Sequence, residues 1–246
     1  YDFMDGDPVD ECAGTRLVRS WTHETSNKIW SSAVENNDNV YFGAFDHNIY
    51  ALSGYDGQLI WDSPASTGGA ITAIPIIEGS RLYVGSFDGI FYSIDIRTGT
   101  VIDEFKDAKG WFWGNPIARD GVIYAPSLDG NLYALDMDNL SLNWLFKTQG
   151  PLVGSPAIID DRIAIPSTDH YVYLVNLNTG EEDDRCDVGS EIRSSIAVHG
   201  DGIYLKTNDH AIRKLVVAKY RNFWRFEEEW KHETDAEGDP VTKWGC

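Results

Sequence analysis

The residues of this chain that could carry chemistry recur at a nearly constant spacing. An aspartate followed by glycine or histidine occurs five times, at separations of 42, 41, 40 and 40 residues. These aspartates are Asp46, Asp88, Asp129, Asp169 and Asp209. Five carboxylates in equivalent places could form a ring. However, Asp-Gly and Asp-His are turn sequences in which the aspartate caps its own backbone. We therefore predict a structural role for them.

The histidines follow the same repeat. Three of them stand directly after an aspartate, where two other repeats have Gly89 and Gly130. These three are His47, His170 and His210. The other three, which show no metal-binding spacing such as HExxH, are His23, His199 and His232. The sequence therefore predicts no metal site and no catalytic residue.

The elements that position these turns are short strands. An apolar run such as Val40–Gly43 precedes each aspartate, and a second run such as Ile49–Leu52 follows it. Two such runs around an Asp-Gly predict a tight β-hairpin. A strand of small residues and proline, such as Gly114–Ile117, precedes each hairpin, as a crowded innermost strand requires.

A fourth strand is expected after each hairpin. Five residues mark its end, each ten residues after the equivalent position of the third strand: Trp61, Asp103, Trp144, Asp184 and Trp224. Four strands in about 40 residues, repeated five times, predict an all-β protein, a β-propeller of four-stranded blades.

The predicted blades form a single domain over residues 1–246. The repeats are expected at about 29–66, 67–108, 109–149, 150–188 and 189–230. The terminal segments 1–28 and 231–246 are expected to close the ring, because an open ring leaves edge strands exposed. Leu17–Trp21 resembles an outermost strand, since Trp21 stands 40 residues before Trp61. We favour five complete blades, with an incomplete sixth as the alternative.

The repeat resembles that of a known family. The segment Tyr83–Gly89, with Asp95 and Thr98-Gly99, is similar to the quinoprotein-like (PQQ-like) propeller repeat, and so is the segment from Asp129 to Trp144. Pyrroloquinoline-quinone dehydrogenases share this repeat with the BamB-type outer-membrane assembly lipoprotein. The resemblance covers residues 29–230 and implies that three tryptophans pack between neighbouring blades: Trp61, Trp144 and Trp224. It does not specify a function.

The charge of the chain excludes some partners. With 20 Lys and Arg against 39 Asp and Glu, the net charge is −19, which repels nucleic acid and anionic membrane surfaces. No apolar stretch approaches the roughly 18 residues that a membrane-spanning helix needs. We therefore expect protein partners, no nucleic acid and no insertion into a membrane.

One aromatic run is a candidate binding site. Trp111-Phe112-Trp113 precedes an innermost strand, which in a propeller begins at one mouth of the central channel. Equivalent places hold Trp30 and Arg193, and Trp and Arg are enriched at binding hot spots. We predict a partner-binding rim of Trp30, Trp111, Phe112, Trp113 and Arg193. The alternative is that these residues pack the floor of the channel.

The sequence argues against catalysis. Quinone-dependent relatives hold a large cofactor and calcium, often above a disulfide of adjacent cysteines, and this chain has no adjacent cysteines. Haem-attachment, nucleophile-elbow and phosphate-loop motifs are also missing. We expect a non-catalytic binding or scaffolding module without a cofactor, and the resemblance implies that it lies in the cell envelope. Two alternatives stay open: a cofactor-binding oxidoreductase domain, and a ligand-sensing ectodomain of a larger protein.

Three cysteines allow one disulfide. If the termini meet, Cys12 and Cys246 come together and Cys186 lies one blade away. We therefore predict a Cys12–Cys246 disulfide, which places the protein in an extracytoplasmic compartment such as the periplasm, the cell surface or the medium. Three reduced thiols in a cytosolic protein are the alternative.

Overall fold

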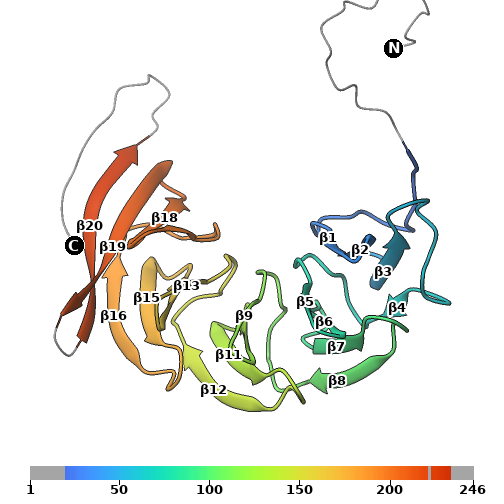
Figure 1. The fold of residues 1–246 in the computed structure, drawn as a ribbon. Coiled ribbons are helices and arrows are strands. Elements are labelled where there is room, and N and C mark those ends of the chain that lie inside the picture. The colour runs from blue at the N-terminus through green and yellow to red at the C-terminus, as the bar shows by residue number, and fades with distance from the viewer. Residues whose placement is uncertain (1–19, 221–222, 234–246) are drawn as a thin grey trace, which may run out of the picture.

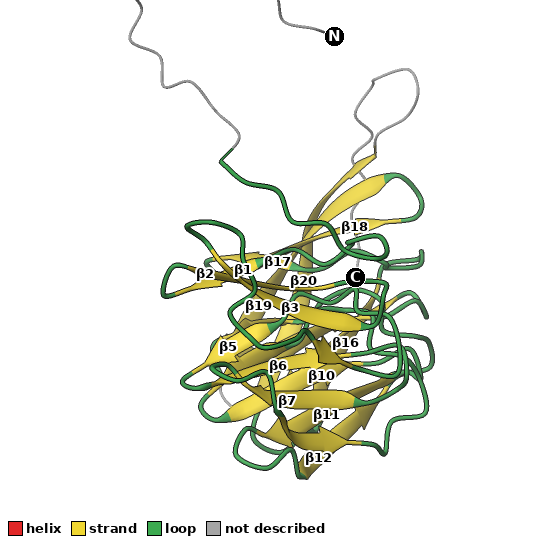
Figure 2. Ribbon diagram, turned by 90° about the vertical axis from the view of Figure 1, so that its right-hand side faces the viewer, coloured by secondary structure: helices red, strands yellow, loops and turns green. Residues whose placement is uncertain are grey.

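The computed structural model describes residues 20–220 and 223–233. Within them the chain forms twenty β-strands joined by turns and loops, and it contains no helix. Figure 2 shows these strands inclined to one another in successive sheets. The all-β class predicted from the repeat is confirmed.

The strands belong to five sheets of four, numbered here in chain order. Sheets 1 to 3 consist of β1 (Val34–Asn36), β2 (Asn39–Gly43), β3 (Asn48–Ser53), β4 (Ala65–Ser66); β5 (Ile76–Glu78), β6 (Arg81–Gly85), β7 (Phe91–Asp95), β8 (Val101–Phe105); and β9 (Ile117–Arg119), β10 (Val122–Pro126), β11 (Asn131–Asp136), β12 (Leu142–Lys147). Sheets 4 and 5 consist of β13 (Ala157–Ile159), β14 (Arg162–Pro166), β15 (Tyr171–Asn176), β16 (Glu182–Asp187); and β17 (Ala197–His199), β18 (Gly202–Thr207), β19 (Ala211–Tyr220), β20 (Phe223–Glu233).

Each sheet is an antiparallel meander, because its strands pair in the order in which they occur in the chain. Figure 1 shows the five sheets as an arc, with the first strand of each sheet toward the inside and the fourth toward the outside. Sheets 1 and 5 lie at the two ends of the arc. This is the blade arrangement of a β-propeller.

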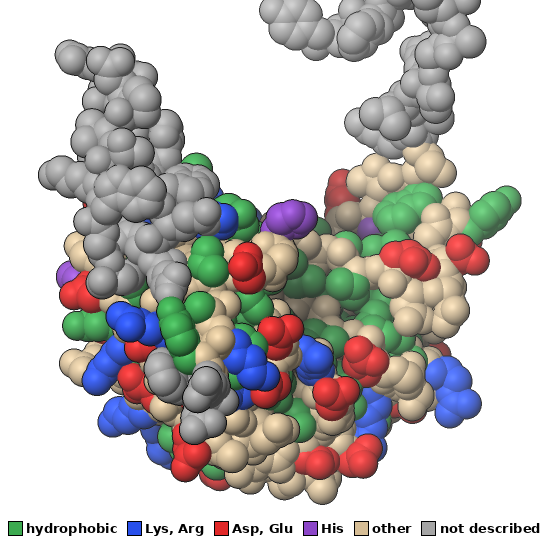
Figure 3. Space-filling view, turned by 60° about the vertical axis from the view of Figure 1, so that its left-hand side comes forward, with side chains coloured by type: hydrophobic (Ala, Val, Ile, Leu, Met, Phe, Trp, Pro, Cys, Tyr) green, Lys and Arg blue, Asp and Glu red, His purple; other side chains and the backbone are tan. Residues whose placement is uncertain are grey.

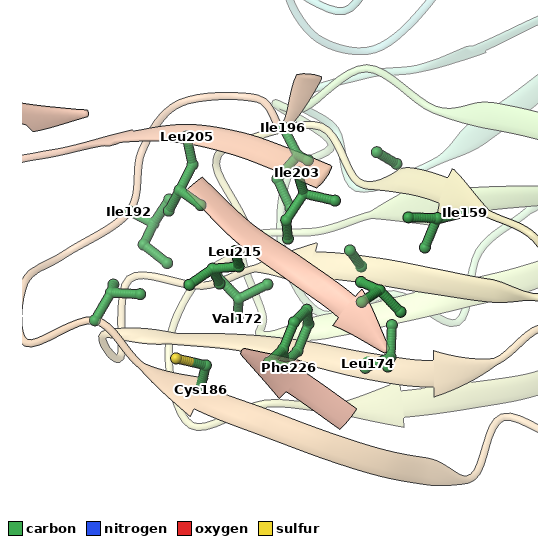
Figure 4. Close-up of a cluster of buried hydrophobic side chains, with 14 of the residues drawn as sticks. Ile159, Val172, Leu174, Cys186, Ile192, Ile196, Ile203, Leu205, Leu215 and Phe226 are labelled. Atoms are coloured by element: carbon green, nitrogen blue, oxygen red, sulfur yellow. The ribbon is translucent and has the colours of Figure 1, made fainter. Parts of the chain in front are cut away.

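The core lies between neighbouring sheets, because the middle strands are apolar on both faces. Between sheets 4 and 5, for example, Val172 and Leu174 of β15 lie in one cluster with Leu215 of β19 and Phe226 of β20 (Figure 4). All four side chains are almost fully buried. Burying apolar surface between blades is the main term that holds such an array together.

The outer strand of sheet 5 differs from the prediction. In sheet 3 the residue opposite Ala134 is Trp144, and a bulge follows. In sheet 5 the residue opposite Lys214 is Trp230, again followed by a bulge, whereas Trp224 lies opposite Lys219. The ten-residue spacing is wrong here because β19 continues through Tyr220, whereas the third strand of each other sheet ends at an earlier turn, such as Asp95–Gly99 in sheet 2. Trp224 is nevertheless buried between sheets 4 and 5.

The end of the arc at sheet 1 is covered by the segment that precedes it. The indole Nε1–H of Trp21 donates to Gly54 O at 2.9 Å, and His23 contacts the ring of Tyr50 edge-on. Trp21 is not in a strand, yet it contacts sheet 1 as an outermost tryptophan should. Most of the terminal segments 1–28 and 231–246 lies outside the described residues. Ring closure and a sixth blade therefore stay predictions.

The disulfide prediction needs correction. Cys186 of β16, expected to be the unpaired thiol, is disulfide-bonded. Cys12 and Cys246 both lie outside the described residues. Because one chain with three cysteines cannot hold both a Cys186 disulfide and a Cys12–Cys246 disulfide, the structure argues against the predicted pair. Cys186 lies in the core between sheets 4 and 5 (Figure 4).

Candidate functional site

The repeated aspartates cap turns and also join neighbouring sheets. Asp88 Oδ1 accepts a hydrogen bond from Ile90 N at 2.8 Å within its own turn. Its Oδ2 accepts bonds from Tyr92 Oη and from Gly68 N, both at 2.7 Å, and Gly68 lies in the loop that leaves sheet 1. The same three donors recur at three further aspartates: Asp46, Asp129 and Asp169. The predicted capping role is confirmed.

The residue after each aspartate has a positive φ. This angle is 69° at His47, 81° at Gly89 and 63° at His210. The left-handed region is open to glycine and tolerated by a few polar residues. The histidines therefore occupy these positions for the geometry of the turn, as predicted.

Burial and hydrogen bonding in these turns shift the pKa values of four tyrosines and of one aspartate. Burial, with the hydrogen bond to Asp46 and the charge of Asp46, raises the pKa of Tyr50 to about 12. The equivalent Tyr92, Tyr133 and Tyr173 also have raised pKa values, for the same reasons. Burial alone would raise the pKa of Asp129, but the donors around it, Tyr133 first, lower it below its ordinary range.

Sheet 5 uses a different partner. Arg213 takes the place of the tyrosine, and its Nη2 lies 2.6 Å from Asp209 Oδ2. The Arg213 side chain is 3% exposed and that of Asp209 33%, so the cation is buried and the carboxylate is partly exposed. The carboxylate of sheet 5 is thus neutralised by a cation, whereas those of sheets 1 to 4 accept hydrogen bonds from uncharged groups.

A line of hydrogen bonds ties the loops that enter the innermost strands. Ile74 N donates to Asn115 Oδ1 at 2.8 Å, Asn115 N donates to Ser155 Oγ at 3.0 Å, and Ser155 N donates to Ser195 Oγ at 3.2 Å. Each acceptor is a short polar side chain in the next sheet. This explains why small residues recur before the first strands, and it holds the channel-side loops in place.

Five aromatic rings from the loops and turns of sheets 1 to 3 form one continuous cluster, which we call the aromatic platform. Its members are Trp30, Phe45, Phe87, Trp111 and Trp113. Phe87 is stacked on Trp111 at 4.9 Å and on Trp113 at 5.2 Å between ring centroids. Trp30 meets Phe45 at 4.7 Å and Trp113 at 6.3 Å, both edge-on.

The platform is open to solvent at two of its rings. Trp30 is 59% exposed and Trp111 is 51% exposed, while the other three are half-buried. The space-filling view shows hydrophobic side chains gathered in the hollow between the two ends of the arc (Figure 3). Exposed, clustered tryptophans are uncommon on a protein surface unless they bind something.

Two residues of the predicted rim lie elsewhere. Phe112 is 1% exposed and packs on Gly85, where an added Cβ would lie 2.2 Å from Phe112 Cβ. It belongs to the core, where its ring contacts Phe91 and Tyr133, whereas Trp111 and Trp113 on either side of it lie in the platform. Arg193 of sheet 5 pairs with Glu191 at 3.0 Å and makes no contact with the platform.

Phe45 and Phe87 were missed by the sequence reasoning. Each stands directly before the repeated aspartate of its sheet, at positions held by Leu128, Thr168 and Asn208 in sheets 3 to 5. An aromatic residue in this place in two consecutive repeats is a usable signal. Only the arc, however, places these turns beside the loops that carry Trp30 and Trp111.

Cavities also lie outside the platform. A cavity of about 290 Å³ lies between sheets 3 and 4, bordered by Arg119, Asp160 and Trp144 among others. In the part of the chain that the structure describes, no group of His, Cys, Asp and Glu is arranged to hold a metal ion. No helix that could cross a membrane occurs there either.

The fold and the repeated Asp–Tyr turns define a β-propeller of the quinoprotein-like repeat class. The chain belongs to the family described as "outer membrane protein assembly factor BamB", which it matches over residues 9–110 and 45–191. The predicted family is confirmed.

Curated proteins of two kinds are similar to this chain. The chain is 25% identical over 203 residues to the outer membrane protein assembly factor BamB of Legionella pneumophila, covering 78% of this chain and 52% of that protein. It is also 24% identical to a tetrathionate hydrolase of Acidithiobacillus ferrooxidans, covering 67% of this chain and 30% of that protein. The chain thus spans about half the length, or less, of these curated relatives.

A solved structure shows the same fold. The crystal structure of BamB from Moraxella catarrhalis superposes with a TM-score of 0.71 at 14% identity. The match covers 90% of this chain and 76% of that one.

Proposed function

We propose that this chain is a non-catalytic scaffold that binds a protein partner through its aromatic platform, in support of outer membrane protein assembly. The observation that carries the proposal is the continuous cluster of five rings, with Trp30 and Trp111 more than half exposed. Partly exposed tryptophans on a rigid frame have the composition of a binding hot spot.

The frame suits this role because it is rigid where the platform is attached. The line of hydrogen bonds from Ile74 to Ser195 fixes the loops that enter the first strands, and the aspartate turns fix the loops beside them. A preorganised surface loses little conformational entropy when a partner binds.

The assembly role rests on the family and on its named members. The relative from Legionella pneumophila carries the name of an outer membrane protein assembly factor. The tetrathionate hydrolase matches this chain over only 30% of its own length. An assembly role also implies an extracytoplasmic location, which agrees with a chain that forms a disulfide at Cys186.

Complementation tests the proposal. Deleting the gene in the source organism should lower the amount of folded outer membrane proteins, measured by their heat-modifiable mobility on gels. Wild type and Tyr55→Ser should restore that amount, because Tyr55 is exposed far from the platform. The double variant Trp30→Ser/Trp111→Ser should not, although its abundance stays normal.

Two results would overturn the proposal. If the deletion leaves the folded outer membrane proteins unchanged, the assembly role is wrong. If the double variant restores them fully, the platform is not the binding surface.

A further inference from the structure

The platform lies beside carboxylates that no cation neutralises. Asp46 and Asp88 directly follow the platform residues Phe45 and Phe87 in the chain. Their hydrogen-bond donors are a tyrosine hydroxyl and backbone N–H groups, which carry no net charge. Among the described residues neither carboxylate forms an ion pair. The contrast is Asp209, which the buried Arg213 neutralises.

The exposed rings of the platform also have no cation–π partner among the described residues. The four cation–π contacts made by described side chains all lie in sheets 4 and 5, where Arg162, Arg185 and Lys219 cover aromatic rings. Among the described residues, no basic side chain forms such a contact with Trp30 or Trp111. In this part of the chain, cations thus cover aromatic rings of sheets 4 and 5 but not the two exposed rings of the platform.

The half-exposed indoles of Trp30 and Trp111 and the nearby carboxylates, which form no ion pair among the described residues, favour the same ligand chemistry. The face of an indole carries negative potential and attracts a cation, most strongly a planar guanidinium that can stack on it. The net charge of −19 adds long-range attraction for a basic partner.

We propose that the aromatic platform binds a basic, extended segment of its protein partner, with arginine side chains stacked on Trp30 and Trp111. The inference rests on the proposed function and specifies the chemistry of the partner. Two exposed rings on either side of Phe87 and Trp113 suit two arginines on one chain better than a single small cation.

Fluorescence anisotropy with a defined probe tests this inference. The probe is a fluorescein-labelled twelve-residue peptide in which four arginines alternate with Gly-Ser spacers. In its matched control peptide citrulline replaces each arginine, which keeps the shape of the side chain and removes its charge. The arginine peptide should bind wild-type protein at least tenfold more tightly than the citrulline peptide.

Variants of the platform should lose this binding. Trp30→Ser/Trp111→Ser should weaken binding of the arginine peptide about tenfold, because two exposed cation–π contacts are lost together. Trp30→Phe/Trp111→Phe keeps aromatic packing and should give a smaller loss, so it replaces the serine variant if that variant unfolds. Asp88→Asn should weaken binding about twofold to threefold. Tyr55→Ser should not change it.

Equal affinity for the arginine and citrulline peptides overturns the inference. So does a platform variant that binds the arginine peptide as tightly as Tyr55→Ser does. If complementation fails for the platform variant while the peptides show no such difference, the binding surface stands and its preference for a basic partner is wrong. If the peptides behave as expected while the platform variant complements the deletion fully, the platform binds a basic chain but is not the surface that supports assembly, and the proposed function is wrong on that point.

Discussion

The indole of Trp61 lies directly over Gly99 of the next sheet. A Cβ added to Gly99 would be 2.7 Å from the ring, and the indole Nε1–H donates to Ile96 O at 2.9 Å. Gly99 also has a φ of 74°, so two separate features of the fold require glycine there.

The same contact between an indole and a turn glycine of the next sheet occurs at two further tryptophans. Trp144 covers Gly180 in the same way, and Trp21 covers Gly57. Sheet 2 has Asp103 in place of the tryptophan, and the turn of the next sheet then holds Leu140, which keeps a positive φ of 55°. Glycine at this turn position of one sheet thus goes with a tryptophan of the preceding segment that packs on it.

The Trp61–Gly99 contact predicts a non-additive pair of substitutions. Gly99→Ala should lower the free energy of unfolding well beyond the 1–2 kcal/mol, roughly, of backbone strain, because it also forces the indole away. In the Trp61→Ala background the same substitution should cost only the strain. Urea denaturation of the four proteins measures this coupling.

Gly79→Ala is the matched control, since Gly79 has a φ of 59° and nothing within 4 Å of an added Cβ. It should cost only the strain. Equal costs for Gly79→Ala and Gly99→Ala in the wild-type background would contradict the close contact with Trp61.

Substitutions of the adjacent residues Phe112 and Trp111 should differ in their cost to the free energy of unfolding. Phe112→Ala should cost about 3–5 kcal/mol of unfolding free energy, because the side chain is 1% exposed and packs on Gly85. Trp111→Ser should change stability by about 1 kcal/mol or less, since half of its side chain faces solvent. Thermal melts measure both effects: similar losses in the two variants would contradict the placement of Phe112 in the core and of Trp111 at the surface.

Alkaline pH should weaken the Asp46–Tyr50 turn. The pKa of Tyr50 is raised to about 12 from an ordinary 10, so the folded state holds this proton more tightly than the unfolded state does. The stabilisation is present in full below pH 10 and is lost as the pH rises toward 12. Unfolding free energies of Tyr50→Phe should therefore fall less steeply between pH 9 and 11.5 than those of wild type.

The control for this pH effect is Tyr55→Phe, which alters an exposed tyrosine. It should show the same alkaline decline as wild type. A parallel decline in Tyr50→Phe and wild type would show that the hydroxyl of Tyr50 does not contribute to it.

Peptide mapping without reduction should recover a disulfide-linked peptide that contains Cys186. Cys186→Ser should then leave the other two cysteines reactive toward a thiol reagent, or let them pair with each other. A Cys12–Cys246 peptide in the wild-type protein, with Cys186 free, would restore the original prediction and contradict the structure.

The repeat by itself determined the blades. Each 40-residue unit carries its own turn signal, with Asp88-Gly89 between two apolar runs as an example, and a hairpin is a local structure that such signals specify. The capping role of the aspartates and the turn role of the histidines could be predicted for the same reason. The register of β20 could not be predicted by spacing, since it depends on how far β19 extends before the chain turns.

The aromatic platform was decided by the tertiary structure. Trp30 and Trp111 could be named from the sequence, but Phe45 and Phe87 come from turns in other parts of the chain, and only the curvature of the arc brings all four rings together. The inward direction of Phe112 likewise depends on the space above Gly85. Local signals specify local structure, whereas the packing of one sheet on the next determines which side chains meet, because those contacts join residues about 40 positions apart.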